Sequence, residues 1–172
     1  NRDLMRQELD ADHLVFGPSV KKLIELNKFG FYKMGDMNWH NHAGIMTYPY
    51  QMAIRHDVNL MIWGETPYDI SGMYDVDDMP EFSKRTRDEF SMRGYEWNDS
   101  VEDNRFDLTE KDLNWMKYPS DEDIEKVGLR GLYLGAYFPW KVKEQTDMIM
   151  SKYSWRPKKD EFQRTYRKMS NL

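Results

Sequence analysis

Apolar residues recur with helical spacing in some parts of this chain and form short unbroken runs in others. The helical segments cover residues 2–9, 20–29, 43–56, 80–93 and 141–153, and the runs cover 13–16, 58–63 and 129–138. Helices that alternate with near-continuous apolar strands are typical of sheets buried on both faces. The pattern therefore predicts the α/β class, with a mostly parallel sheet flanked by helices.

Glycine, proline and small polar residues set the expected helix boundaries. Ser19 can cap the helix that starts beside it, and Gly30 is expected to end that helix. Pro49 lies inside the next helix, so either it kinks this helix or the regular helix begins near Thr47. The polar residues 38–42 in front of it are expected to form a loop, in which extended backbone would place His40 and His42 on one side.

Acidic residues concentrate in the middle of the chain. Residues 65–126 contain 19 acidic and 8 basic side chains, whereas residues 127–172 contain 4 acidic and 10 basic ones. We expect the acidic part, about 75–126, to be a helical insertion. Two pairs with capping-box spacing predict short helices within it: Thr109 with Asp112, and Ser120 with Asp123.

The bulk composition limits the function classes. A chain of 172 residues with 40% hydrophobic residues can form one domain with a substantial core, so residues 1–172 are expected to be a single α/β domain. The absence of cysteine excludes a thiol nucleophile, a cysteine-ligated zinc site and a persulfide carrier. The net charge is only -5, and no apolar run approaches the roughly 20 residues of a membrane span. We expect a cytoplasmic protein with neither nucleic acid nor membrane as its partner.

Two short motifs carry the candidate chemistry: Asn38-Trp39-His40-Asn41-His42, and Trp63-Gly64-Glu65 at the end of an apolar run. Open α/β sheets bind ligands at the carboxyl ends of their strands. The two histidines could hold a metal or a substrate oxyanion, or they could cap a helix. No further histidine spacing completes a zinc site. Glu65 could act as a base, orient a substrate, contact Mg2+ or be a solvated acid.

Two further pairs of residues are weaker candidates. Gly72 and Tyr74 follow Glu65 in a long acidic loop, and loops of this length are often functional. Arg164 and Arg167 belong to a basic cluster near the end of the chain. That cluster is either a solvated helical face or a site for an anion such as phosphate.

A series of motifs occurs in one order along nearly the whole chain: 31–36, 38–40, 42–45, 49–53, 62–65, 71–74, 93–95, 108–113, 117–121, 131–135 and 164–171. In this series the chain resembles the N-acetyl sugar amidotransferase family of surface-polysaccharide and pseudaminic-type sugar biosynthesis. That family belongs to the PP-loop ATP pyrophosphatase superfamily. The resemblance implies a partial Rossmann-like fold of the adenine nucleotide alpha hydrolase-like type.

One departure from the family pattern is the phosphate loop. The superfamily's Ser-Gly-Gly-x-Asp-Ser motif does not occur in this chain and would lie upstream of Asn1. We therefore expect the chain to be the C-terminal part of such an enzyme and, by itself, not to hydrolyse ATP, because the backbone amides of that loop cradle the phosphates.

The resemblance implies an ATP-dependent amidotransferase for lipopolysaccharide or O-antigen synthesis. ATP, with Mg2+, would adenylate the acetamido oxygen of a nucleotide-activated sugar, and ammonia would then displace AMP and leave an acetamidino group. A glutaminase subunit and a cyclase-like subunit would supply the ammonia, and the protein could form a homo-oligomer. The resemblance gives His40, His42 and Glu65 as expected catalytic residues. The expected substrate-binding residues are Asn38, Trp39, Trp63, Gly64, Gly72, Tyr74, Arg164 and Arg167.

Three alternatives remain open from the sequence. One is a tRNA-modifying PP-loop enzyme, which the lack of cysteine and the acidic balance disfavour. Another is a non-catalytic interaction module. The last is a histidine-based metallohydrolase.

Overall fold

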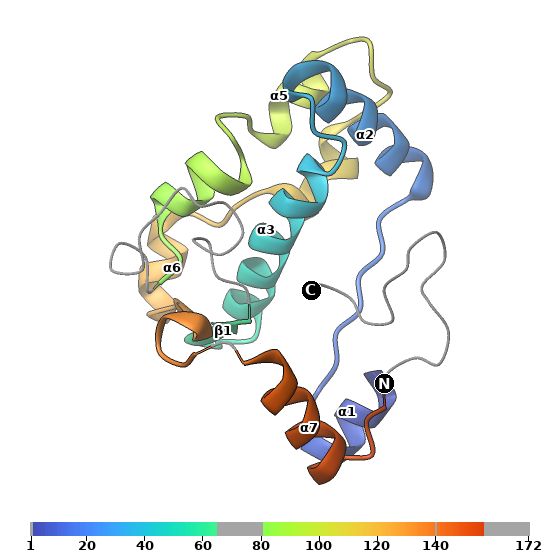
Figure 1. Cartoon of the computed structure of the whole chain (residues 1–172). Helices are drawn as coiled ribbons and strands as arrows, with labels where there is room; N and C mark the ends of the chain where they lie inside the picture. The colour runs from blue at the N-terminus through green and yellow to red at the C-terminus, as the bar shows by residue number, and fades with distance from the viewer. Residues whose placement is uncertain (1, 65–80, 140, 157–172) are drawn as a thin grey trace. The chain divides into compact units, whose positions relative to one another are not determined.

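The structure is a computed structural model that describes residues 2–64, 81–139 and 141–156 (Figure 1). The chain divides into two compact units. The larger unit comprises residues 17–139, and the smaller one combines residues 1–16 with 140–172. All the candidate site residues with a described position lie in the larger unit.

The larger unit is rich in helices and contains a small sheet, so its fold is mixed α and β. Its helices and strands are, in order, α2 (Val20–Met34), α3 (Trp39–Arg55), β1 (Leu60–Trp63), the π-helical turn η1 (Thr86–Ser91), α5 (Trp97–Glu102), the 3-10 helix η2 (Glu110–Met116), α6 (Asp121–Val127), β2 (Arg130–Tyr133) and the 3-10 turn η3 (Leu134–Ala136).

The two strands pair in parallel, in a register that runs from Leu60 opposite Arg130 to Trp63 opposite Tyr133. Glu81 adds one antiparallel bridge to β2, and its carboxylate pairs with the Arg130 guanidinium. Parallel pairing agrees with the predicted α/β class.

The prediction that the strand within 58–63, observed as β1, is buried on both faces is wrong for the part of the chain that the structure describes. Met61 and Trp63 face the core, whereas Leu60 and Ile62 are 49% and 54% exposed. Side chains of a strand alternate between its faces, and only one face of β1 packs against described neighbours. The strand predicted over 129–138 also ends early, because the chain turns into η3 after Tyr133.

Helix α3, which is labelled in Figure 1, contributes side chains to two separate hydrophobic clusters. Its buried positions 39, 43, 46, 50 and 53 follow one another at intervals of four and three residues, which places them on one face of a helix. The first two positions belong to a cluster with α2, η2 and Met92. The other three belong to a cluster with Trp63, Phe82 and Tyr133.

Pro49 lies inside α3, and the helix begins at Trp39, well before it. The alternative that the regular helix starts near Thr47 is therefore wrong. The Thr47 hydroxyl donates a hydrogen bond of 2.6 Å to the carbonyl of Ala43 within the same helix.

The predicted end of α2 at Gly30 is also wrong, because α2 continues for another turn to Met34. Gly35 ends it in the left-handed conformation, with φ of 71°, and its N–H donates to Phe31 O. Gly30 is instead a contact position, because a Cβ there would collide with the carbonyl oxygen of Asp36.

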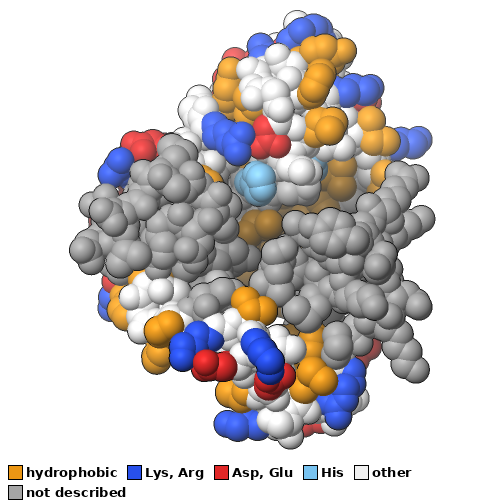
Figure 2. Space-filling model, viewed as in Figure 1, with side chains coloured by type: hydrophobic (Ala, Val, Ile, Leu, Met, Phe, Trp, Pro, Cys, Tyr) orange, Lys and Arg blue, Asp and Glu red, His pale blue; other side chains and the backbone are white. Residues whose placement is uncertain are grey.

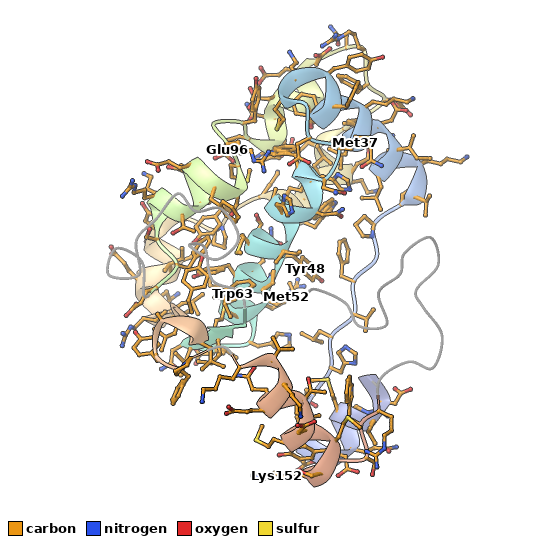
Figure 3. The ribbon with its side chains drawn as sticks, viewed as in Figure 1. Met37, Tyr48, Met52, Trp63, Glu96 and Lys152 are labelled. Carbon is orange, nitrogen blue, oxygen red and sulfur yellow. The ribbon has the colours of Figure 1, made fainter. Side chains whose placement is uncertain are left out.

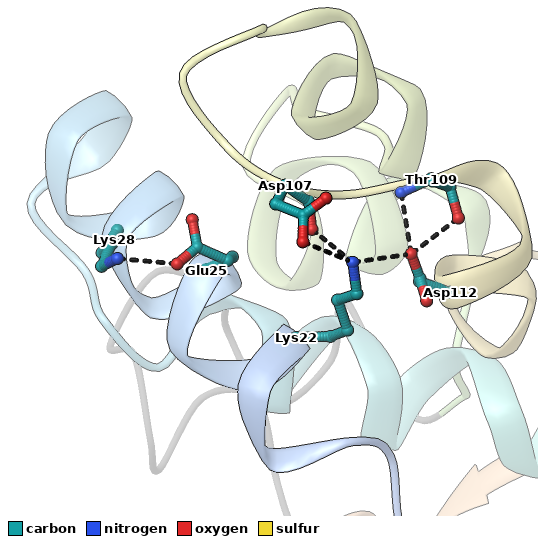
Figure 4. Close-up of polar contacts among 6 residues, drawn as sticks. All are labelled: Lys22, Glu25, Lys28, Asp107, Thr109 and Asp112. Atoms are coloured by element: carbon teal, nitrogen blue, oxygen red, sulfur yellow. Dashed lines mark hydrogen bonds and ion pairs between the residues drawn. The ribbon is translucent and has the colours of Figure 1, made fainter.

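Both predicted capping pairs are present. Thr109 and Asp112 form a reciprocal capping box at the start of η2, and the Ser120 hydroxyl accepts a hydrogen bond of 3.1 Å from the Asp123 N–H at the start of α6. Lys22 of α2 joins the first of these caps. Its ammonium donates 2.6 Å to the carbonyl of Asp107 and lies 3.3 Å from the Asp112 carboxylate (Figure 4).

The predicted helix over 80–93 is only partly present, since η1 covers six of its residues and has π-helical rather than α-helical bonding. Helix α5 has no counterpart among the predicted elements, although Glu96 and Asp99 form a capping box at its start.

The smaller unit contains α1 (Arg2–Leu9) and α7 (Val142–Lys152), both close to their predicted ranges. The Ser154 hydroxyl donates a hydrogen bond of 3.3 Å to the Glu8 carboxylate. The predicted strand over 13–16 is wrong: these residues have no regular structure and are exposed. A short apolar run forms a strand only when a neighbouring strand pairs with it, and no described residue does so here. None of the described helices is both long and apolar enough to cross a membrane.

The close contact between α3 and η2 gives a stability prediction. A Cβ at Gly44 would collide with the six-membered ring of Trp115, which is buried, so Gly44→Ala should lower the free energy of unfolding by about 1–3 kcal/mol despite the better helix propensity of alanine. Urea denaturation measures this value. Gly64→Ala is the control, because no described atom beyond its chain neighbours lies within 4 Å of a Cβ at Gly64. Equal stability of the two variants would contradict the packing of α3 on η2.

Candidate functional site

Asp36 organises the start of α3. Its carboxylate accepts a hydrogen bond of 2.8 Å from the Asn38 N–H, and its carbonyl accepts one of 3.3 Å from the Trp39 N–H. The first N–H groups of a helix need such acceptors, because no earlier turn provides them. Asn38 takes the N-cap position, and its Oδ1 accepts a hydrogen bond of 3.3 Å from the side-chain Nδ2 of Asn41. Residues 38–42 are therefore a helix cap and first turn, not the predicted loop.

Helical backbone separates the two histidines. Residues two positions apart on an α-helix lie about 200° apart around its axis. His40 is only 3% exposed, and its Nδ1 has no hydrogen-bond partner among the described residues. The side chain of His42 is 45% exposed. The expectation that both face one side is thus wrong, and the described geometry does not allow them to share a ligand.

Burial is the main influence on the ionisation of His40. It lowers the pKa of the imidazole below its ordinary value, and nearby His42 acts in the same direction. The Met37 backbone and the Asp36 carboxylate act in the opposite direction but do not cancel the effect. His40 is consequently held in its neutral form inside the protein.

His42 belongs to a small charged group at the surface. Its Nδ1 lies 3.7 Å from Oδ2 of Asp36, and the same oxygen lies 2.8 Å from Nη1 of Arg93. Figure 2 shows a histidine beside an acidic and a basic side chain on the visible face. Asp36 and Arg93 were not among the predicted site residues. Asp36 lies in the motif segment 31–36 and Arg93 in 93–95, so the motif series could have pointed to both residues.

Trp39 is a core residue in this structure. Its side chain is fully buried, its Nε1–H donates a hydrogen bond of 2.9 Å to the carbonyl of Met92, and its ring lies 5.3 Å from that of Phe29. These contacts tie α3 to α2 and to the end of η1. The ring has no exposed face with which to contact a substrate.

Trp63 lies at the carboxyl end of β1, in the second hydrophobic cluster. Its ring stacks on Tyr50 at a centroid distance of 6.5 Å, and its buried Nε1 has no hydrogen-bond partner among the described residues. In Figure 3, Trp63 lies near the C-terminal end of α3, close to Met52, whereas Met37 lies near the N-terminal end of that helix. Gly64 follows at the surface, and a Cβ at this position would meet no described atom within 4 Å apart from its chain neighbours.

The second cluster contains an aromatic group that the sequence did not single out. Tyr118 lies 5.3 Å from the ring of Tyr50, and the guanidinium of Arg87 lies 4.8 Å from the centre of the Tyr118 ring. Burial raises the pKa of both tyrosine hydroxyls, so both remain protonated at neutral pH. Gly131 of β2 makes room for this group, because a Cβ there would collide with the Tyr50 hydroxyl.

The structure does not bring the two predicted motifs together into one site. Trp63 of the second motif packs on Tyr50 of α3. Tyr50 follows His40 by ten residues on this helix, which corresponds to about 15 Å along its axis. The remaining predicted site residues lie outside the described residues: Glu65, Gly72, Tyr74, Arg164 and Arg167. Within the described ranges, no three histidine or carboxylate side chains gather closely enough to hold a metal ion.

Comparisons with known proteins assign no family to the chain. No protein-family model matches it, and no curated protein is significantly similar to it. The amidotransferase relationship therefore remains a hypothesis based on the motif series.

The buried histidine gives a prediction on pH. Unfolded His40 has an ordinary pKa near 6.5, whereas the folded protein lowers it. As the pH falls below about 6.5, the unfolded state binds a proton that the folded state does not, so the free energy of unfolding should decrease. Urea denaturation at several pH values measures this slope, and His40→Gln should reduce it. A variant with the same slope as the parent would contradict the burial of His40.

Proposed function

We propose that this chain contributes part of the sugar site of an ATP-dependent N-acetyl sugar amidotransferase with a PP-loop, Rossmann-like fold. The observation that carries the proposal is the ordered motif series along the chain. One structural fact supports it: the motif segments 31–36, 42–45 and 93–95 contribute Asp36, His42 and Arg93 to one partly exposed charged group. Arg93 is distant in sequence from the other two residues, and the mutual geometry of titratable side chains is one criterion for a candidate site.

The parallel pair of strands supports the same proposal. In α/β sheets, ligands bind beyond the carboxyl ends of parallel strands, and the carboxyl ends of β1 and β2 lie side by side at Trp63 and Tyr133. Gly64 follows directly at the surface, and a Cβ there would meet no atom of the described chain. This edge can therefore take part of a sugar or nucleotide.

In the proposed reaction, the acetamido oxygen of a nucleotide-linked sugar attacks the α-phosphorus of ATP and releases pyrophosphate. Ammonia then adds to the activated carbon, and AMP leaves with the C–O electron pair, so that an acetamidino group remains. Adenylation is needed because an amide oxygen is a poor leaving group. The described residues contain neither the Ser-Gly-Gly-x-Asp-Ser loop nor a carboxylate cluster, so we assign them no contact with the phosphates or Mg2+.

The two histidines receive different roles in this proposal. His42 is accessible and next to a carboxylate, so it is the candidate proton acceptor for the attacking nitrogen. His40 is buried and neutral, and we assign it to holding the start of α3 in place. Glu65 remains the predicted residue for orienting ammonia.

One observation favours a second function, that of a non-catalytic assembly module. Val58, Leu60 and Ile62 are exposed on one side of β1, although parallel sheets are usually covered on both faces. An assembly module would bury this side without any reaction at His42.

The test uses the longest natural protein that contains this sequence. It is incubated with ATP, Mg2+, ammonium and a panel of UDP-linked acetamido sugars, and pyrophosphate release is measured together with ¹⁵N incorporation into the sugar. The proposal predicts release that requires both sugar and ATP, and a loss of about 10²–10⁴-fold in His42→Gln. His56→Gln, which alters an exposed histidine at the other end of α3, is the control and should remain active.

Absence of pyrophosphate release with every sugar would reject the amidotransferase. Release that depends on tRNA instead of a sugar would favour the tRNA-modifying alternative.

A further inference from the structure

Asp36 holds three neighbours at once. One carboxylate oxygen accepts the Asn38 N–H at 2.8 Å, and the other lies between Arg93 at 2.8 Å and His42 at 3.7 Å. Its side chain is only 19% exposed, so these groups replace most of its contacts with water. A carboxylate fixed in this way has one orientation relative to the imidazole.

We infer that Asp36, held by Arg93, is a positioning residue that sets the tautomer of His42 and leaves Nε2 as its proton-accepting atom. The orientation of the ring is a property of the chain alone. Its use in the transfer of ammonia rests on the function proposed above.

The physical argument begins with the two ring nitrogens. A neutral imidazole carries one proton, and a carboxylate beside Nδ1 favours the tautomer with the proton on that atom. Nε2 then has a free electron pair. The distance of 3.7 Å is longer than a hydrogen bond, but such contacts commonly shorten when a substrate binds.

Arg93 contributes by fixing the carboxylate. Its guanidinium pairs with the same oxygen that faces His42, which prevents that oxygen from turning away. Arg93 follows η1, so it also links the ring orientation to an element far away in sequence.

The proton balance of the proposed step is complete. Ammonia uses its electron pair to form the new C–N bond, the C=N π pair moves onto the sugar nitrogen, and the added nitrogen becomes positively charged. Nε2 of His42 accepts one proton from this nitrogen, and the N–H electron pair stays on nitrogen. A nitrogen lone pair then re-forms the C=N bond as the C–O bond breaks, and the C–O electron pair leaves with AMP.

The first experiment measures the tautomer directly. The protein is labelled with ¹⁵N-histidine, the His42 signals are assigned by their loss in His42→Gln, and the ring nitrogen shifts are recorded where the ring is neutral. The inference predicts mainly the Nδ1–H form in the parent and a shift towards the Nε2–H form in Asp36→Asn. Asparagine retains an oxygen for the Asn38 N–H but lacks the charge.

Asp103→Asn is the matched control. Asp103 is also a largely covered carboxylate between two cations, Lys33 at 3.3 Å and Arg105 at 2.6 Å, but no histidine pairs with it. Its replacement should leave the His42 tautomer unchanged. If Asp36→Asn does not fold, Arg93→Gln provides the second variant, and it should reduce the Nδ1–H form to a smaller extent. An unchanged tautomer in the folded variants would overturn the inference.

The second experiment applies the pyrophosphate assay to the same variants. Asp36→Asn should lower kcat at least tenfold with little change in KM for the sugar, and combining it with His42→Gln should cost no more than His42→Gln alone. Independent, additive losses would overturn the positioning role. If no variant and no parent releases pyrophosphate, the proposed function fails, but the tautomer measurement still decides the orientation.

Discussion

The burial of one face of α3 is the constraint on which the larger unit depends. The same stripe of side chains packs into both hydrophobic clusters, with Trp39 and Ala43 at one end and Tyr50 and Ala53 at the other. An interior proline costs a helix about 3 kcal/mol, whereas each large apolar side chain contributes about 1.5–3 kcal/mol on burial. Several buried side chains along α3 outweigh the cost of Pro49, which explains why the helix continues through it.

This constraint also determines what the histidines can do. Because the buried face of α3 includes Trp39, Ala43 and Thr47, the helical repeat places His40 nearer to the centre of this face than His42. Asp36 then serves both as the acceptor for the start of the helix and as the neighbour of the exposed ring. The stability of the helix and the arrangement of the candidate site thus depend on the same carboxylate.

Local sequence signals predicted the features that depend on local interactions. The caps at Thr109 and Ser120 needed only short-range patterns, whereas the pairing of the two apolar runs joins residues about 70 positions apart and was not predicted. The turn at 38–42 could not be predicted in this way, because its polar residues are typical of loops, and its helical form is held by the burial of Trp39 against Met92 and by the hydrogen bonds to Asp36. Gly30 was misassigned for a similar reason, since close packing on Asp36 looks the same in sequence as a helix end.

The site was only partly accessible from sequence. Motif resemblance pointed to the segments that contain Asp36 and Arg93, but their pairing across the chain required the fold. The unit's aromatic group around Tyr50 and Tyr118 depends likewise on contacts between distant segments. Sequence therefore suggested the segments of the candidate site, whereas the structure shows which of their described side chains are exposed and which are buried.

The opposite environments of the two histidines are the central claim, and chemical labelling tests them most directly. Brief treatment of the native protein with diethyl pyrocarbonate, followed by peptide mass spectrometry, reports which imidazoles are accessible. The chain contains four histidines, and His13 and His56 are exposed internal references. The account predicts that His42 is labelled to a similar extent as these references while His40 is protected. Equal labelling of His40 and His42 would show that residues 38–42 form an open loop and would contradict the account.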